Sequence, residues 1–119
     1  VGGFEGGTVT WAPTNITYGH NNRSAQFRLP QNRYCIENRA ADMMMNVYLA
    51  LAMTVSAATE GIKNKIDPGK PTDINIYEAP ASVLAKIPST PGSLAESLDT
   101  LEKDHKYLLE VGHPLLPMH

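Results

Sequence analysis

Cysteine, long hydrophobic runs and an excess of either charge are scarce or absent in this 119-residue sequence. The single cysteine, Cys35, excludes an internal disulfide framework and a cysteine-rich zinc site. The longest apolar region, residues 47–58, is interrupted by Thr54 and Ser56 and is too short to span a bilayer. A formal net charge of -2 gives no electrostatic footprint for nucleic acid or an anionic membrane. We therefore expect a cytoplasmic protein that binds neither nucleic acid nor membranes.

Four short strands are predicted in the N-terminal third of the chain. Residues 8–11 and 15–18 are rich in β-branched and aromatic side chains, and two further strands are expected over residues 25–29 and 34–40. Pro30, Gln31 and Asn32 lie in the short connection between the last two strands, and a connection this short favours an antiparallel pair.

The rest of the chain is predicted to be mainly helical. Asn46 is the expected N-cap of an almost wholly apolar helix that ends near Gly61, and we expect this helix to be buried and to form the core. An Asp-Pro-Gly turn at residues 67–69 precedes a proline-rich extended segment that runs to about Pro80. A short helix is predicted over residues 81–86.

The clearest helix signal lies near the end of the sequence. Ser93 and Glu96 have the spacing of a capping box, and Gly112 and Pro114 mark the expected end of the helix. Its single apolar stripe consists of Leu94, Leu98, Leu101 and Leu108. We predict one continuous helix between these signals.

These elements predict an α+β fold in a single domain. Antiparallel strands are expected mainly in residues 1–45 and helices mainly in residues 46–119. A mass of 13.0 kDa allows one domain with a modest core and is too small for two of ordinary size. The opening VGGFEGG has no initiator methionine, and its glycine density suits a loop better than a chain start. We therefore expect the sequence to be a portion of a longer protein.

The two kinds of basic residue are distributed unequally. All of the arginines lie between Arg23 and Arg39, whereas every lysine lies at or beyond Lys63. The guanidinium group is a rigid, always charged fork that engages two oxygens of a carboxylate or phosphate at once, which the ammonium group cannot do. The cluster therefore indicates an anion that is held in a fixed geometry.

The spacing of the charged residues suggests how they converge. Glu37 and Arg39 are two residues apart, so a strand would place them on one face, where they could bind a metal ion and an anionic substrate group. Arg23 and Arg28 are five apart, so we expect Arg23 in the bend before the strand, from which both approach one site. The alternative is that these groups form only weak surface ion pairs.

Other candidate residues favour structural interpretations. The four histidines, at positions 20, 105, 113 and 119, show no metal-ligand spacing, and His105 is expected on a surface or half-buried helix position. Met43, Met44 and Met45 are expected to fill the core. Cys35 is expected to be a buried thiol because no base is identifiable nearby.

Six sequence blocks extend the argument beyond single residues. In chain order they are NNRSAQFRLP, IENR, NVYLALA, EGIKNKIDPG, YEAP and IPSTPGSLAESLDTLEKDH. In order and spacing, from about Trp11 to Leu109, they resemble the C-terminal portion of the catalytic domain of bacterial-class glutamine synthetases. The resemblance implies a homo-oligomeric ligase that uses ATP and Mg²⁺ or Mn²⁺. Such a ligase phosphorylates the γ-carboxylate of glutamate and transfers the γ-glutamyl group to ammonia.

The resemblance also implies roles for individual residues. Arg23, in the NRSA block, is implied as a catalytic residue, and Arg23 and Arg28 as contacts for the phosphates of the nucleotide and of γ-glutamyl phosphate. Glu37 is implied as a metal ligand and Arg39 as a clamp for substrate glutamate. These roles agree with the chemistry of phosphoryl transfer, which depends on positioning and on neutralising charge spread over oxygens.

Two positions depart from the family pattern. Cys35 stands where the family commonly has an arginine, and Arg33 is the candidate that could reach the phosphates in its place. Trp11 stands where the family has a glutamate that takes a proton from ammonium, and an indole cannot accept that proton. Either Glu5 supplies the carboxylate, or the acceptor is methylamine, a polyamine or another amine that packs against Trp11.

A third hypothesis is a homologue that has lost catalysis and serves as a structural or regulatory subunit. The joint presence of the four charged site residues argues against it, because unpaired charges on partly buried strands cost stability unless something uses them. The resemblance places further metal ligands and the glutamate-binding loop upstream of this sequence. We therefore expect the 119 residues alone to be inactive.

Overall fold

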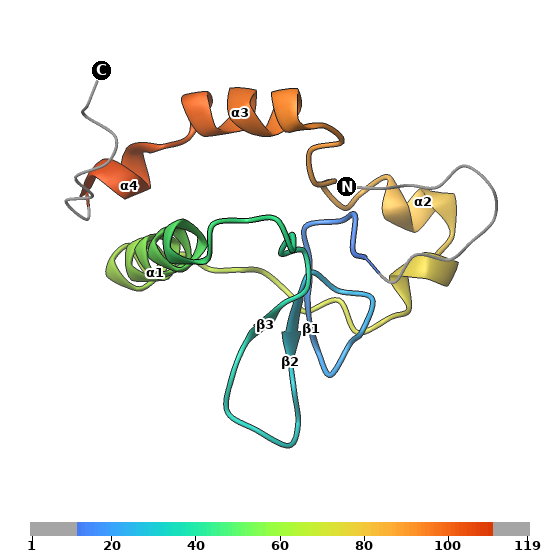
Figure 1. Ribbon diagram of the computed structural model, residues 1–119. Coiled ribbons are helices and arrows are strands. Elements are labelled where there is room, and N and C mark those ends of the chain that lie inside the picture. The colour runs from blue at the N-terminus through green and yellow to red at the C-terminus, as the bar shows by residue number, and fades with distance from the viewer. Residues whose placement is uncertain (1–11, 111–119) are drawn as a thin grey trace. The chain divides into compact units, whose positions relative to one another are not determined.

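The computed structural model describes residues 12–110 (Figure 1). These residues form a small three-stranded sheet, helices α1 to α4 and one 3-10 helix, η1, which is an α+β fold as expected. The strand predicted at residues 8–11 and the helix end predicted at Gly112 and Pro114 lie outside the described residues. Among the residues that are described, no helix is both long and apolar enough to cross a membrane.

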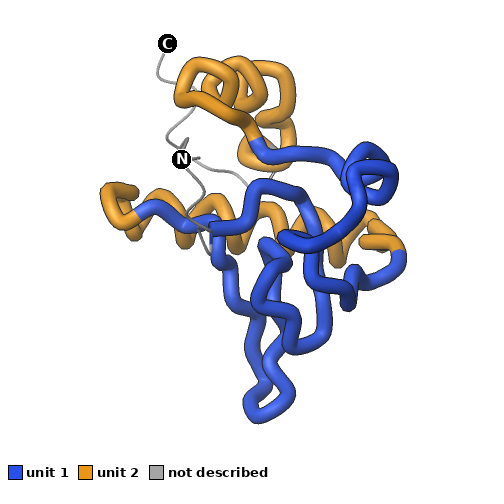
Figure 2. Tube along the Cα trace, turned by 90° about the vertical axis from the view of Figure 1, so that its right-hand side faces the viewer, with its two compact units in different colours: residues 1–42, 70–90 blue, residues 43–69, 91–119 orange. Residues whose placement is uncertain are grey.

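The chain divides into two compact units (Figure 2). The first consists of residues 1–42 and 70–90, and the second of residues 43–69 and 91–119. The chain therefore leaves the first unit and later returns to it. The first unit contains the sheet, η1 and α2, whereas α1, α3 and α4 belong to the second.

The sheet has the strand order β1-β2-β3, with β1 at Tyr18–His20, β2 at Phe27–Leu29 and β3 at Glu37–Asn38. β2 and β3 pair antiparallel, which confirms that expectation, and Arg28 lies directly opposite Glu37. All three strands are shorter than the sequence predicts. The short β3 ends before Arg39, so the argument that a strand places Glu37 and Arg39 on one face does not hold.

The pairing of β1 with β2 is parallel, which corrects the expectation of antiparallel strands throughout this region. The backbone enters the left-handed region at Asn21, with a φ of 52°, immediately after β1. Asparagine is one of the few residues that tolerate this conformation. Residues 21–26 then double back, so the chain enters β2 in the same direction in which it left β1. Of the strand predicted at residues 15–18, Tyr18 begins β1, and Asn15 forms an isolated bridge with Ser89.

The returning segment of the first unit lies against β1. The Thr72 amide donates to the Tyr18 carbonyl at 2.7 Å. A Cβ atom at Gly19 would lie 2.4 Å from the Thr72 carbonyl oxygen, so only glycine permits this approach. The same unit contains most of the small buried core, in which Ala25 is fully buried and Ile76 is 4% exposed.

Helix α1, Val47–Lys63, begins where the sequence predicts and runs two residues past Gly61. The Asn46 side chain accepts hydrogen bonds from two amides of the first turn, as expected of an N-cap. The expectation that α1 is the buried core is wrong, because Ser56 is its one buried residue and Tyr48 is 86% exposed. A helix that is apolar on every side needs apolar partners on every side to be buried, and among the described residues the short helix α4 packs against α1.

The remaining elements follow the local signals. Asp67 accepts from the Gly69 amide at 2.8 Å, which confirms the turn. The short helix α2, Ala81–Leu84, is close to its predicted range, whereas η1, Ile76–Glu78, was expected to be extended. The last predicted helix is divided into α3, Leu94–Lys103, and α4, Lys106–Glu110.

The division of the last helix has a local cause. Asp104 leaves the helical region, with φ of -132° and ψ of 74°. The capping box at the start of α3 is present in a modified form. The Ser93 hydroxyl accepts from the Glu96 amide at 3.2 Å, while the Glu96 carboxylate accepts from the Gly92 amide at 2.7 Å. The start of α3 is therefore fixed as predicted, although the prediction of one continuous helix is wrong.

Candidate functional site

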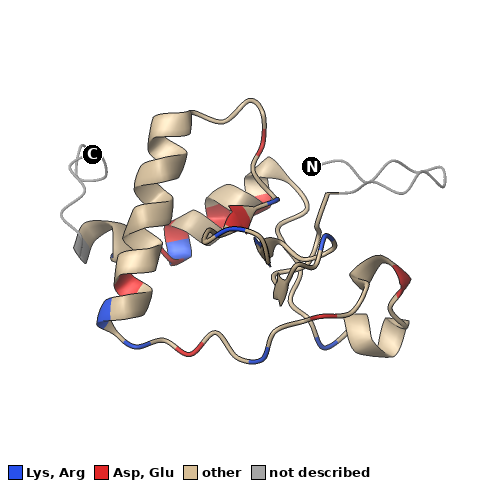
Figure 3. Cartoon of the chain, turned by 90° about the horizontal axis from the view of Figure 1, so that it is seen from below, with Lys and Arg blue, Asp and Glu red and all other residues tan. Residues whose placement is uncertain are grey.

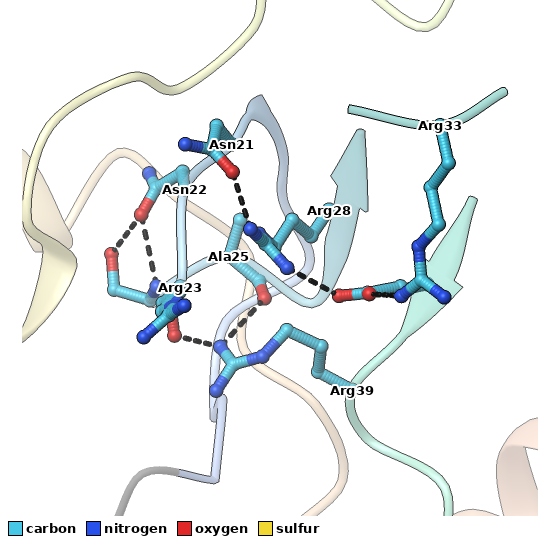
Figure 4. Close-up of polar contacts among 9 residues, drawn as sticks. Asn21, Asn22, Arg23, Ala25, Arg28, Arg33 and Arg39 are labelled. Atoms are coloured by element: carbon cyan, nitrogen blue, oxygen red, sulfur yellow. Dashed lines mark hydrogen bonds and ion pairs between the residues drawn. The ribbon is translucent and has the colours of Figure 1, made fainter. Parts of the chain in front are cut away.

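Arg28 and Glu37 form an ion pair across β2 and β3 (Figure 4). Their strand positions are directly opposite, and the Arg28 Nη1 atom donates to Glu37 Oε2 at 2.9 Å. Opposite positions on an antiparallel pair bring side chains of this length into contact. The side chains are 15% and 26% exposed, respectively, so the pair is partly shielded from water.

The second oxygen of Glu37 is engaged by Arg33, which lies in the loop between β2 and β3 (Figure 4). Arg33 Nη2 donates to Glu37 Oε1, so the carboxylate sits between two guanidinium groups. The hydrogen bond from Arg28 is the largest cause that lowers the pKa of Glu37, and the bond and charge of Arg33 add to it against partial desolvation. Glu37 therefore remains a carboxylate at neutral pH and orients both arginines.

Arg28 is held from two directions. Its Nη2 atom donates to the side-chain oxygen of Asn21, while Nη1 is bound to Glu37. The Nε atom is buried and has no hydrogen-bond partner within the described part of the chain. The fork therefore has a defined orientation, and its Nε–H is a buried donor that remains unused among the described residues.

Arg39 contacts the bend that carries Arg23 (Figure 4). Its Nη1 atom donates to the carbonyl oxygen of Arg23 and, at 3.3 Å, to that of Ala25. The Arg39 amide also donates to the Gln26 carbonyl at 2.8 Å. Arg39 thus bonds to the backbone before β2, whereas Glu37 bonds to the side chains of Arg28 and Arg33.

Arg23 is exposed and lies in the bend between β1 and β2, as the spacing predicts. Within residues 12–110, its guanidinium group makes no hydrogen bond or ion pair, in contrast to those of Arg28 and Arg33. The structure therefore gathers the four predicted site residues around β2 and β3 and leaves the fork of Arg23 available to a ligand.

Two further residues of this region were not predicted from the sequence. Asn22 and Ser24 flank Arg23 and hydrogen-bond to residues 72–76 of the returning segment. Polar residues in a bend carry a local turn signal, but no pattern in the sequence identifies partners about fifty positions away. Their contacts are visible only in the folded chain.

His20 and Asp73 form another contact between β1 and the returning segment. The His20 amide donates to Asp73 Oδ1 at 2.7 Å, and the imidazole Nδ1 lies 3.3 Å from Oδ2. The backbone hydrogen bond from His20 is the largest cause that lowers the pKa of Asp73. Both side chains are exposed, so this contact is an anchor at the surface.

The described residues do not by themselves fit a divalent metal ion. No group of three His, Cys, Asp or Glu side chains among them could hold one. Glu37 supplies a single carboxylate, and both of its oxygens already accept from arginines. A hard divalent cation requires several oxygen ligands. Glu37 as a metal ligand therefore stays a prediction.

The structure tests several other predictions, whereas two concern residues that it does not describe. Trp11 and Glu5 lie outside the described residues. Cys35 is exposed, so the prediction of a buried thiol is wrong. The expectation that the methionines fill the core is also wrong, because Met43 and Met44 are exposed. These side chains lie before α1, where the described chain provides little to cover them. His105 is partly buried, as expected, but it lies in the break between α3 and α4 and not on a helix.

Comparison with known proteins identifies the family. The family described as glutamine synthetase, catalytic domain, matches residues 8–116. The chain belongs to this family. The match extends through the arginine cluster and both compact units, and it confirms the resemblance on which the site residues were assigned.

Curated glutamine synthetases are similar over most of the chain. The protein of Microchaete diplosiphon is 48% identical over 106 residues, which are 85% of this chain. The glutamine synthetase of Aquifex aeolicus is 46% identical over 83% of the chain, and that of Mycobacterium tuberculosis is 42% identical over 85%. The chain spans 22% of the length of each of these relatives.

A solved structure supports the same assignment. It is described as a GmaS/ADP complex in conformation 1, and it is 32% identical to this chain with a TM-score of 0.75. The similarity covers 86% of this chain and 23% of that one. Most of this chain therefore has a counterpart of similar fold within a much larger solved chain.

Proposed function

We propose that this chain forms the C-terminal part of the catalytic domain of an ATP-dependent ligase that joins glutamate to ammonia. The observation that carries the proposal is the arrangement at β2 and β3. Arg28 and Arg33 are oriented by one carboxylate, and the fork of Arg23 has no partner among the described residues. Family membership and the ADP in the similar solved complex support a nucleotide-dependent reaction.

In the proposed reaction the arginines bind and neutralise phosphoryl oxygens. A transferring phosphoryl group spreads negative charge over several oxygens, and fixed guanidinium forks stabilise that charge without reorganising. Arg23 has the exposed fork and is proposed to contact the transferring group. Arg28 and Arg33 are proposed to hold nucleotide phosphates, with Glu37 keeping both in place.

The proposal includes partners that the described residues do not contain. ATP and Mg²⁺ or Mn²⁺ are proposed as cofactors and glutamate as the substrate that Arg39 clamps, in a cytoplasmic homo-oligomer. The described carboxylates do not by themselves complete a metal site.

A second candidate function is the ligation of glutamate to methylamine, a polyamine or another amine. The observation that favours it is Trp11, which replaces the proton-accepting glutamate of the family pattern. Its indole ring offers an apolar wall and no base. If Glu5 supplies the missing carboxylate, ammonia remains the acceptor.

Phosphate release by the full-length protein tests both candidates. With ATP and glutamate, the assay compares ammonium, methylamine, a polyamine and an aromatic amine. Preference for ammonium supports a glutamine synthetase, and preference for another amine supports the second candidate. Absence of amine-dependent phosphate release contradicts both.

The variant Arg23→Ala should lower kcat by about a hundredfold or more, in the range known for loss of a transition-state donor. Lys103→Ala, on the exposed face of α3, is the matched control for loss of a surface cation.

A further inference from the structure

The bend that carries Arg23 is anchored on both sides of this residue. Asn22 precedes it and Ser24 follows it, and both bind residues 72–76, which return to the first unit after an excursion of the chain. Ser24 is 5% exposed and Ala25 is fully buried, although Arg23 between Asn22 and Ser24 is exposed. The chain is therefore buried directly after this exposed side chain, and it is half-buried at Asn22 directly before it.

Both the Nδ2 and the Oδ1 atom of the Asn22 side chain form hydrogen bonds. The Nδ2 atom donates to the carbonyls of Thr72, at 2.6 Å, and Ile74, at 2.9 Å. The Oδ1 atom accepts from the Ser24 amide at 2.9 Å. Two donors facing two carbonyls define which way the amide is turned. An aspartate at this position would place an acceptor against both carbonyls.

Ser24 joins the same network through its hydroxyl group. Its Oγ atom accepts from the buried Ile76 amide at 2.9 Å and donates to Asn22 Oδ1 at 2.7 Å. The hydroxyl has one proton, and the Ile74 carbonyl at 3.2 Å is the more distant acceptor. Loss of this oxygen would leave the Ile76 amide buried without its partner, which is costly.

Arg39 holds the opposite side of the bend. Its contacts to the carbonyls of Arg23 and Ala25 complement the bonds that Asn22 and Ser24 make to residues 72–76 (Figure 4). The backbone of Arg23 is thereby prevented from swinging, and only its side chain remains adjustable. Fixing a reactive group before the substrate arrives removes an entropic part of the barrier.

We propose that Asn22 and Ser24 are positioning residues that fix the backbone of Arg23 against residues 72–76, so that its guanidinium group meets the transferring phosphoryl group. The inference rests on the proposed function, since it assigns the role of Arg23 to that reaction. Neither Asn22 nor Ser24 touches the substrate in this scheme. Both act through Arg23, so their effect on kcat should depend on the presence of Arg23, whereas a general effect on stability should not.

The test is a double-mutant cycle in the full-length protein with the amine that supports phosphate release. Ser24→Ala and Asn22→Asp should each lower kcat by about tenfold to a hundredfold, the scale of a misplacement near 1 Å. In an Arg23→Ala background the same changes should lower kcat less than about twofold, because the group they position is gone. Ser24→Thr, which keeps the hydroxyl, should restore most of the activity.

Thr90→Val is the matched control. The Thr90 hydroxyl also donates to a carbonyl across the first unit, that of Thr14 at 3.1 Å, but away from the bend. The effect of Thr90→Val on kcat should be small, and it should be equal in the wild-type and the Arg23→Ala backgrounds. Hydrogen exchange of the Ile76 amide provides a readout besides activity, and it should be faster in Ser24→Ala than in wild type.

The outcomes separate this inference from the proposed function. If Arg23→Ala keeps wild-type kcat, the role proposed for Arg23 fails and the inference fails with it. If Arg23→Ala is impaired but Ser24→Ala and Asn22→Asp keep kcat, or lower it equally in both backgrounds, the inference alone is overturned. If Ser24→Ala does not fold, Asn22→Asp decides. Failure of both to fold would mean a global structural role and would also overturn it.

Discussion

At the scale of the residue, one carboxylate organises the candidate site. Glu37 accepts from Arg28 on one oxygen and from Arg33 on the other. The sequence predicted that these residues converge, since Arg28 and Glu37 fall on two strands joined by a short connection. It could not predict the bond from Arg33, because the loop conformation between the strands decides it. Arg33 thus reaches the site from beside Cys35, at which the family pattern commonly has an arginine.

The lowered pKa of Glu37 predicts a dependence of stability on pH. Because the folded-state pKa lies below the unfolded-state value of about 4.3, ionised Glu37 stabilises the fold at every pH above that value. The contribution is lost as the pH falls from there through the lower folded-state pKa. The Tm of wild type should therefore exceed that of Glu37→Gln at neutral pH, and the difference should shrink over this acidic range.

Thermal unfolding of both proteins across pH checks this prediction. Glu102→Gln, at an exposed position on α3, is the control, and its Tm should stay close to that of wild type throughout. A difference between wild type and Glu37→Gln that remains constant as the pH falls would contradict the assignment of the stabilisation to the ionised carboxylate.

At the scale of the element, features that depend on neighbouring residues were predicted well, whereas the pairing of β1 with β2 and the helix break were not. Asn46 and Ser93 cap α1 and α3 as expected, because a cap depends on the next few residues. The parallel pairing of β1 with β2 depends on the left-handed turn at Asn21 and was missed. The break between α3 and α4 was missed as well, since the leucine periodicity continues across it.

The close approach of β1 to the returning segment yields a prediction at this scale. Gly19→Ala should lower the free energy of unfolding by about 1–3 kcal/mol, because its Cβ would lie 2.4 Å from the Thr72 carbonyl oxygen. Gly61→Ala, on α1 with nothing within 4 Å of the added Cβ, should raise it by about 0.5–1 kcal/mol. Urea denaturation of the two variants measures both, and equal effects would contradict the close approach.

At the scale of the whole molecule, the chain spans 22% of the length of its curated relatives, and its longest described helix is mostly exposed. The apolar helix α1 was expected to be the core, yet Tyr48 and Ile62 are exposed. Sequence patterning identified the helix correctly but could not say what covers it. The charges agree with a site confined to one unit, since all the arginines lie in the first unit while the lysines are spread over both. Figure 3 shows that basic and acidic residues are otherwise interspersed along the chain.

The isolated 119 residues are predicted to release no phosphate from ATP in the presence of glutamate and an amine. The reason is that the described residues supply one candidate metal carboxylate, and its two oxygens are engaged by arginines. The measurement is the same assay as for the full-length protein, with folding of the isolated chain checked by circular dichroism. Amine-dependent turnover by the isolated chain would contradict the prediction.

The separation in sequence between the Arg23 bend and its support has a consequence for biosynthesis. Ser24 and the Ile76 amide that it binds are 52 positions apart. While the ribosome is still adding residues 43–69, the partners of Asn22 and Ser24 in residues 72–76 have not been made, so the bend gains these hydrogen bonds only after residue 76 has emerged. A proteolytic cut within residues 43–69 would leave Arg23 and its support on separate polypeptides.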